Sequence, residues 1–297
     1  MKRIEPQYVY RNFPTDPAYT PSHYVALKFG EPGERLFGQI LVPDGRYEAP
    51  RPCVLLWHGF PGAVTMDDLA HALCRAGCVA VVAHYRGAWG SEGKYLLSHV
   101  IEDALRLTMY MHDEGPALYN VDPDAVFLFG HSMGTCASIN AARKLPWLRG
   151  LILAAPYDPG VHIDRDDAAP FISLMQYGDV LNSDGIDALI EDGLAHRDEL
   201  AFSEAFPYIK DRNVFLLYGE LDRLAPPEEM AEPLWKEICG NRAGEPARVM
   251  LAEDTAAEGF EDPLQLLKGY PDAHGLYGCR TEVARDAAEF IRLCLGE

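Results

Sequence analysis

The chain has 297 residues, of which 48% are hydrophobic and 24% charged, so it can bury a sizeable core and is not disordered as a whole. A formal net charge of −19 argues against nucleic acid and anionic membranes as main partners, because both attract basic surfaces. Neither a signal peptide nor a run of about 18 apolar residues is visible, so we expect a cytoplasmic protein without a membrane span.

The N-terminal part of the chain predicts an arm followed by a hairpin. Residues 1–22 place four prolines between aromatic residues, which is typical of an extended segment on the surface of a fold. Apolar residues then alternate partly over Tyr24–Phe29 and Leu36–Val42, with Glu31-Pro32-Gly33 between the two runs. This pattern predicts an antiparallel pair of strands.

From residue 53 onward the apolar residues form short, nearly continuous runs, as expected for strands that are covered on both faces. The predicted strands are Cys53–Trp57, Cys78–Ala83, Ala125–Phe129, Leu151–Ala155, Val214–Tyr218 and Val249–Leu251. Helices are predicted from a capping box at Thr65 to about Arg75, and over His99–His112, Met133–Lys144 and Glu282–Cys294. The alternation predicts an α/β fold with a mostly parallel central sheet, helices on both faces and the antiparallel hairpin at one edge.

Two connections are longer than is usual between a strand and the next element. Residues 157–212 contain helical patterns at Ile186–Leu194 and Glu199–Phe206, and we expect them to form a small cap insertion. Residues 252–273 are rich in Asp, Glu, Gly and Pro and are expected to be a loop. The chain is therefore predicted to be one domain, residues 1–297, that carries the cap within it.

The sequence Gly130-His131-Ser132-Met133-Gly134 lies between a predicted strand and a predicted helix. A turn this sharp holds its middle residue in strained backbone angles, and flanking glycines let the strand and the helix pass closely. The Ser132 hydroxyl would then stand exposed at the start of a helix, where the dipole favours developing negative charge. Ser132 is therefore the predicted nucleophile.

A nucleophilic serine needs a base, and the base needs an acid that holds its tautomer. His274 lies in a turn-rich segment before the last predicted helix, beyond the serine in the chain, and is the predicted base. Asp222 follows the strand Val214–Tyr218 and is the predicted acid, with Glu220 as the alternative. His131 is expected to face away from the site.

Acyl transfer also requires hydrogen-bond donors for the developing oxyanion. One predicted donor is the backbone N–H of Met133, directly after the serine. The other is the N–H of Phe60 in the sequence Trp57-His58-Gly59-Phe60-Pro61-Gly62, where two glycines around an aromatic residue suit a tight loop that turns an amide inward. An ordinary Gly/Pro turn is the alternative reading of this loop.

The chain from about Leu36 to its end resembles an α/β-hydrolase. The motifs that carry the resemblance are HGFPG at 58–62, HYRGAWGSEG at 84–93, GHSMG at 130–134, GELD at 219–222 and DAHG at 272–275. HYRGAWGSEG is similar to a stretch shared by prolyl-oligopeptidase-like peptidases and feruloyl-esterase-like cytosolic esterases. The resemblance implies a serine hydrolase of this branch, since dienelactone hydrolases have cysteine and dehalogenases have aspartate where this chain has Ser132.

The expected substrate is an uncharged small or medium ester, and the expected enzyme is carboxylesterase-like. Apolar cap residues are the predicted pocket walls: Phe171, Met175, Tyr177, Phe206 and Tyr208. One alternative is a small exopeptidase or acylaminoacyl-type peptidase, for which Asp164, Asp166 or Asp167 would hold a substrate amine. A non-catalytic binding module is a second alternative. No metal and no organic cofactor is expected, and a homodimer is left open.

Overall fold

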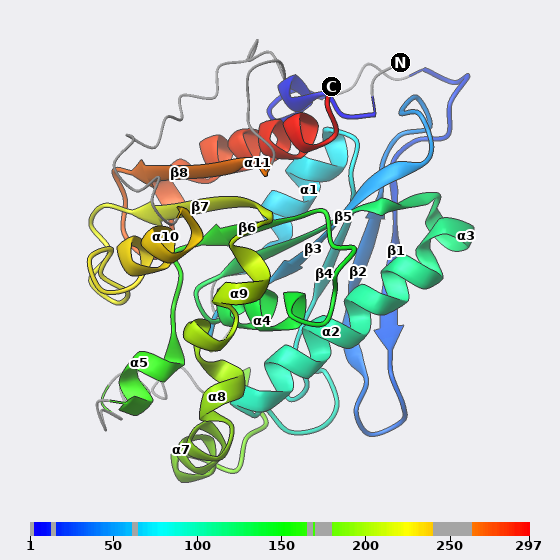
Figure 1. Ribbon diagram of the computed structural model, residues 1–297. Helices are drawn as coiled ribbons and strands as arrows, with labels where there is room; N and C mark the ends of the chain where they lie inside the picture. Colours follow the sequence, from blue (N-terminus) through cyan, green and yellow to red (C-terminus); the bar gives the residue numbers. More distant parts are fainter. Residues whose placement is uncertain (1–2, 13–15, 61–64, 165–168, 170–179, 240–262) are drawn as a thin grey trace.

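The computed structural model describes residues 3–12, 16–60, 65–164, 169, 180–239 and 263–297 (Figure 1). Within these ranges eight strands form one sheet in the order β1-β2-β4-β3-β5-β6-β7-β8. The pairs β1–β2 and β2–β4 are antiparallel, and every other pair is parallel. The strands are β1 (His23–Phe29), β2 (Leu36–Val42), β3 (Arg51–Trp57), β4 (Val79–Ala83), β5 (Val121–His131), β6 (Gly150–Ala154), β7 (Asn213–Gly219) and β8 (Gln265–Tyr270). The predicted mostly parallel sheet with an antiparallel edge hairpin is thereby confirmed.

The central strands have hydrophobic side chains on both faces because each face of the sheet has its own core. In β3, Leu55 and Trp57 belong to one apolar cluster, whereas Leu56 belongs to the cluster on the opposite face. Successive side chains of a strand point to opposite faces, so a strand that is covered on both sides must be apolar at nearly every position. This explains the continuous apolar runs in the sequence.

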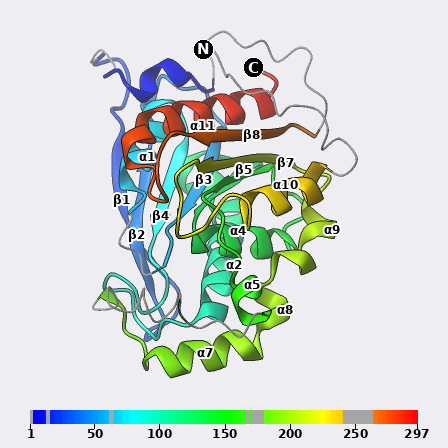
Figure 2. The same ribbon diagram turned by 90° about the vertical axis from the view of Figure 1, so that its left-hand side faces the viewer.

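Helices cover the two faces of the sheet. α1 (Asp67–Arg75) and α11 (Arg280–Cys294) lie together on one face, and α2 (Leu97–Asp113) and α4 (Met133–Ala142) pack against each other on the other face (Figure 1). α3 (Gly115–Tyr119) follows α2, and α10 (Ala231–Cys239) packs against β7 and β8. The 90° view in Figure 2 shows the sheet between these helices.

Only helical elements are described between β6 and β7. They are α5 (Pro159–Asp164), α7 (Ile186–Ala195), α8 (Arg197–Leu200), a 3-10 turn η3 (Phe202–Glu204) and α9 (Phe206–Ile209). α7 is fixed to the start of α2, since the N–H and hydroxyl of Ser98 donate to the carboxylate of Asp192 at 2.8 and 2.7 Å. Part of residues 157–212 lies outside the described ranges, so the cap assignment stays a prediction.

Three predictions of elements were wrong in detail. The single helix expected over Glu199–Phe206 is broken, because Ala201 is extended with φ −68° and ψ 138°. The expected loop 252–273 contains β8, an edge strand whose side chains are only partly buried and which therefore lacks a continuous apolar run. The expected strand Val249–Leu251 lies outside the described residues. The N-terminal arm is not wholly extended, since Pro6–Val9 form the 3-10 turn η1 against α1 and α11.

The capping box predicted at Thr65 is absent. α1 begins at Asp67, and no side chain caps its N-terminus. In a capping box the acidic side chain three residues after the cap reaches back to the cap N–H. Asp68 instead accepts a 2.7 Å hydrogen bond from Nε of Arg280 on α11, which ties the two helices on this face together.

Candidate active site

Ser132 lies at the junction of β5 and α4 in a backbone conformation that side chains rarely adopt. Its φ is 55° and its ψ is −122°. A Cβ on Gly130 would lie 2.2 Å from the carbonyl oxygen of Gly134, and a Cβ on Gly134 would lie 2.2 Å from that of Trp57. Both glycines are thus required by the close passage of strand and helix. Such local strain is typical of functional sites.

The side chains of Ser132, His274 and Asp222 meet in one hydrogen-bonded row. His274 Nε2 lies 2.8 Å from Ser132 Oγ, and His274 Nδ1 lies 2.7 Å from Asp222 Oδ2. The carboxylate of Asp222 is buried, and its other oxygen accepts the N–H groups of Leu224 and Ala225 at 2.9 Å each. Both oxygens are therefore fixed, and one of them is directed at the imidazole. The structure brings together all three residues predicted for these roles.

Parallel strands explain why these distant residues meet. Ser132 follows β5, Asp222 lies beyond β7, and His274 lies beyond β8, and all three strands run parallel. Their carboxyl ends therefore share one edge of the sheet, which is the usual place for a site in such folds. The alternative acid, Glu220, is exposed and lies beside Gly269, away from this row.

The loop after β3 lies directly against Ser132. A Cβ on Gly59 would stand 2.7 Å from Cβ of Ser132, so the backbone that leads into Phe60 passes beside the hydroxyl. Met133 is the first residue of α4, and the first N–H groups of a helix have no partner within it. The two predicted oxyanion donors are thus on the two segments that flank Ser132. Their roles stay predictions.

Two buried histidines flank the site. His58, before Gly59, directs Nδ1 at the Gly59 carbonyl oxygen 2.8 Å away, and burial lowers its pKa to about 3. His131 directs Nε2 at the backbone carbonyl oxygen of His274, also 2.8 Å away. Burial lowers the pKa of His131 to about 3 as well. The expectation that His131 faces away from the site is wrong, because its ring contacts the loop that carries His274, and nothing in the sequence indicated this contact.

The segment after β4 is fixed by a buried ion pair. The backbone N–H and the Nε of Arg86 donate to the carboxylate of Asp103 on α2 at 2.8 and 2.7 Å. Burial raises the pKa of Asp103 to about 6, although Arg86 favours the charged form. Farther along, Trp89 has φ 48° and is 42% exposed. This segment follows the carboxyl end of β4, so it lies at the same edge of the sheet as Ser132.

The predicted pocket walls are only partly covered by the structure. Phe171, Met175 and Tyr177 lie outside the described residues. Tyr208 on α9 is half-exposed, and its ring faces the guanidinium of Arg143, 5.9 Å away. Arg143 follows the last residue of α4, whereas Ser132 precedes the first, about 15 Å away along the helix axis. The structure does not bring Tyr208 to Ser132. Phe206 is partly buried against the core and packs there.

The predicted amine-binding carboxylates are also only partly described. Asp164 accepts a 2.8 Å hydrogen bond from Nε of Arg197 and is engaged in that ion pair. Asp166 and Asp167 lie outside the described residues. Of the three candidates, the one that the structure describes already has a cationic partner from this chain.

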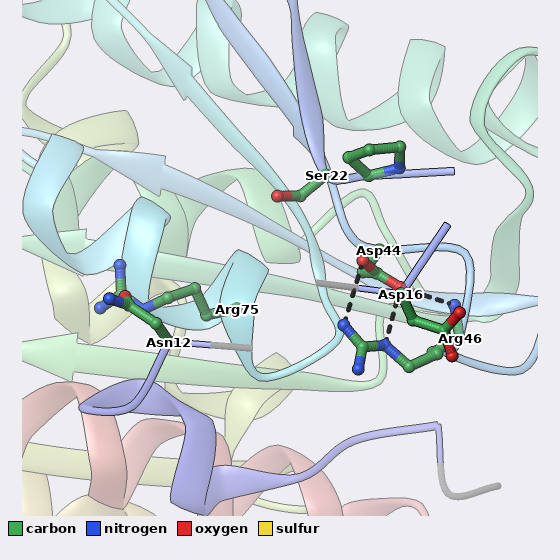
Figure 3. Close-up of a pocket in the computed structure, with 7 residues that line it drawn as sticks. Asn12, Asp16, Ser22, Asp44, Arg46 and Arg75 are labelled. Carbon is green, nitrogen blue, oxygen red and sulfur yellow. Dashed lines mark hydrogen bonds and ion pairs between the residues drawn. The ribbon is translucent and has the colours of Figure 1, made fainter. Parts of the chain in front are cut away.

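A cavity of about 260 Å³ lies beside the N-terminal arm (Figure 3). It is lined by Asn12, Asp16, Pro21, Ser22, Asp44, Arg46 and Arg75. Asp44 follows the end of β2, which runs antiparallel to β4, so the cavity lies at the opposite edge of the sheet. Arg46 is paired with Asp44, and Arg75 donates to the Tyr8 and Val9 carbonyls. Arg75 thereby attaches the arm to α1, whereas Arg46 is paired with its neighbour in the chain.

No group of three or more His, Cys, Asp or Glu side chains in the described ranges is arranged to hold a metal ion. In the same ranges no helix combines the length and the apolar character that crossing a membrane requires.

Comparison with known proteins gives a family match over part of the chain. The family model described as "Serine aminopeptidase, S33" matches residues 48–176, which include Phe60 and Ser132 but neither Asp222 nor His274. No curated protein gives a significant match.

Solved structures match over most of the chain at low sequence identity. Est1E from Butyrivibrio proteoclasticus is 15% identical, with a TM-score of 0.62 over 92% of this chain and 99% of its own. Brefeldin A esterase, described as a bacterial homologue of human hormone sensitive lipase, is 19% identical, with a TM-score of 0.62 over 97% and 82%. Puromycin hydrolase is 18% identical, with a TM-score of 0.59 over 93% of this chain and 39% of its own. These likenesses confirm the fold that the motifs predicted.

Proposed function

We propose that this chain, an α/β hydrolase, cleaves carboxylic esters through an acyl intermediate on Ser132. The observation that carries the proposal is the row Ser132 Oγ, His274 and Asp222, with separations of 2.8 and 2.7 Å at its two contacts. The strained φ of 55° at Ser132 supports it, because the fold maintains that strain at the reacting residue.

The hydrogen-bond directions define the resting state of the row. A carboxylate only accepts hydrogen bonds, so His274 Nδ1 carries the ring proton and Nε2 is left bare. The bare Nε2 accepts the Ser132 hydroxyl and can take its proton as Oγ attacks the ester carbonyl. Asp222 then stabilises the imidazolium that forms.

The remaining steps follow from proton balance. Attack forms the Oγ–C bond and places negative charge on the carbonyl oxygen, which the Phe60 and Met133 N–H groups would receive. Collapse of this intermediate breaks the bond to the alkoxy group, and His274 returns its proton to the leaving alcohol. Water then attacks the acyl-serine, gives its proton to His274 and releases the carboxylic acid and free Ser132.

The substrate we propose is an uncharged ester with a medium or aromatic acyl group. The support is twofold: the structural neighbours include named esterases, one of them described with ferulic acid bound, and the net charge of −19 disfavours anionic substrates at long range.

A fluorophosphonate probe tests the nucleophile. We expect the wild type to be labelled and Ser132→Ala to be unlabelled at the same folded concentration. Ser138→Ala, at a buried serine six positions farther along α4, is the matched control and should label like the wild type. An unlabelled wild type would favour the binding module instead.

The second candidate function is a small aminopeptidase or acylaminoacyl-type peptidase. The partial match to the serine aminopeptidase family favours it. Against it, Asp164 is already paired with Arg197 and cannot hold a substrate amine without losing that partner. Comparing p-nitrophenyl esters with aminoacyl p-nitroanilides separates the two, and a higher kcat/KM on the anilides would replace the esterase proposal.

A further inference from the structure

We propose that His131 is a positioning residue that holds the base, His274, at hydrogen-bonding distance from Ser132. This inference rests on the proposed function and deepens it. The observation is the 2.8 Å contact between Nε2 of His131 and the backbone carbonyl oxygen of His274, across 143 positions in the chain.

The direction of this hydrogen bond fixes the state of the His131 ring. A carbonyl oxygen can only accept, so Nε2 of His131 carries a hydrogen and donates it. Among the described residues, Nδ1 of His131 is buried without a hydrogen-bond partner, which fits a neutral ring with its one proton on Nε2. The side chain is 1% exposed, and within the described part of the chain its one hydrogen bond is to the loop that carries His274, residues 271–276, called the base loop below.

The surroundings keep His131 neutral while His274 cycles between charge states. Besides burial, protonated His274 and Arg280 disfavour a positive charge on the His131 ring, and the hydrogen bond to the backbone of His274, which favours that charge, does not offset them. Its pKa of about 3 lies far below the range in which a histidine base works. The donor at Nε2 therefore stays in place throughout the reaction.

The rest of the base loop is attached to the segment that carries the acid. The N–H of Leu221 donates to the carbonyl oxygen of Asp272 at 2.9 Å, and Gly219 packs against the carbonyl oxygens of Asp272 and Ala273. These contacts fix the loop relative to Asp222. They leave the backbone of His274 itself to be fixed from the other side, which is the side of Ser132.

His131 supplies that second attachment because it precedes the nucleophile in the chain. Residue 274 is thus bound twice to consecutive residues: its ring to the Ser132 hydroxyl and its carbonyl oxygen to the His131 ring, each at 2.8 Å. The imidazole is also held at Asp222, so displacement of its backbone would tilt the ring and lengthen the contact to Oγ. A misplacement of about 1 Å at a reacting pair can cost on the order of 100-fold in rate.

Two variants of His131 separate the contribution of its hydrogen-bond donor from the contribution of its side-chain volume. His131→Leu removes the donor and keeps an apolar side chain of moderate size. His131→Gln places an amide N–H the same number of bonds from Cα as Nε2 and should still reach the carbonyl oxygen. We expect His131→Leu to lower kcat about 10- to 100-fold with KM changed less than threefold, and His131→Gln to recover at least a third of the wild-type kcat.

A double-variant cycle tests whether His131 acts through His274. In a His274→Ala background, adding His131→Leu should leave the residual rate on an activated ester unchanged within twofold, because the group being positioned is gone. His112→Leu, a histidine stacked on Trp147 away from the site, is the matched control for histidine loss. Near-ultraviolet circular dichroism establishes that each variant is folded.

Three outcomes would overturn the proposal: a His131→Leu enzyme with wild-type kcat, an equal loss in His131→Gln, or a further loss in the His274→Ala background. The last two would assign His131 to packing alone. A wild type that neither hydrolyses esters nor reacts with the fluorophosphonate would instead defeat the proposed function.

Discussion

Gly59 lies so close to Ser132 that a side chain at position 59 could not be placed without moving one of the two segments. A Cβ there would be 2.7 Å from Cβ and 3.2 Å from Oγ of Ser132. Carbon atoms in contact normally remain about 3.5–4.0 Å apart. The loop after β3 is therefore packed against Ser132, and the position of the Phe60 amide depends on that contact.

Gly59→Ala should move the Phe60 amide away from the reacting carbonyl while the sheet stays intact. We expect kcat on a p-nitrophenyl ester to fall about 100- to 1,000-fold, the typical loss of one oxyanion donor. Gly193→Ala on α7 is the control, because its Cβ would meet only the ends of two flexible side chains, Cδ1 of Leu97 at 3.2 Å and Cδ1 of Ile163 at 3.6 Å. A Gly59→Ala enzyme with near-normal kcat would remove the loop from the mechanism.

Asp222→Asn should inactivate the enzyme through the tautomer of His274. The oxygen that accepts the Leu224 and Ala225 N–H groups must remain an oxygen, so the amide nitrogen would face His274 Nδ1. Nδ1 would then accept, Nε2 would carry the hydrogen, and the ring could not take a proton from Ser132. We expect kcat to fall on the order of 1,000-fold or more with little change in melting temperature. Asp192→Asn on α7 is the matched control, and its kcat should remain normal.

The parts of the site that were predicted from sequence are those that depend on local order. Ser132 was identified by the glycines and the strand-to-helix change around it, and Asp222 and His274 by their places after it in the chain. Parallel strands then bring such positions together at one edge of the sheet.

The parts that were missed depend on distant partners. The role of His131 is set by a carbonyl oxygen 143 positions away, which leaves no trace in the residues around it. β8 was not predicted because an edge strand buries only part of its side chains and therefore lacks a continuous apolar run. The capping box failed because Asp68 is engaged by Arg280 on a helix far along the chain. For His131 and Asp68 a tertiary contact overrode the local pattern, and for β8 the place of the strand at the sheet edge weakened the pattern.

Breaking the buried pair between Arg86 and Asp103 should destabilise the whole fold. Their side chains are 3% and 2% exposed, so Asp103→Asn would leave the buried guanidinium of Arg86 without its buried carboxylate partner. We expect the free energy of unfolding to fall by about 3–5 kcal/mol in urea denaturation. Glu102→Gln, which alters an exposed partner of the same arginine, should cost no more than about 1 kcal/mol. If the two variants lost the same free energy of unfolding, the buried Arg86–Asp103 pair would contribute no more to stability than the exposed Arg86–Glu102 pair, which would contradict this prediction.

Asp158 should make stability depend on pH. Its carboxylate accepts the N–H groups of Gly160 and Phe202 at 2.9 and 3.3 Å, and burial raises its pKa to about 6. Arg197 favours its charged form and Asp164 opposes it. Since an unfolded Asp titrates near 3.9, the folded state binds more protons than the unfolded state between about pH 4 and pH 6.

The free energy of unfolding should therefore fall as pH rises through that window, by up to about 3 kcal/mol from this one group. Asp158→Asn keeps an oxygen for the Gly160 N–H and cannot ionise, so its free energy of unfolding should lack this part of the pH dependence, and its difference from the wild type should change across the window. Urea denaturation at half-unit intervals from pH 4 to pH 7 measures the difference between the two proteins. If the difference in the free energy of unfolding between the two proteins stays constant across the window, Asp158 has the same pKa in the folded and unfolded chains. That result would contradict a pKa raised by burial.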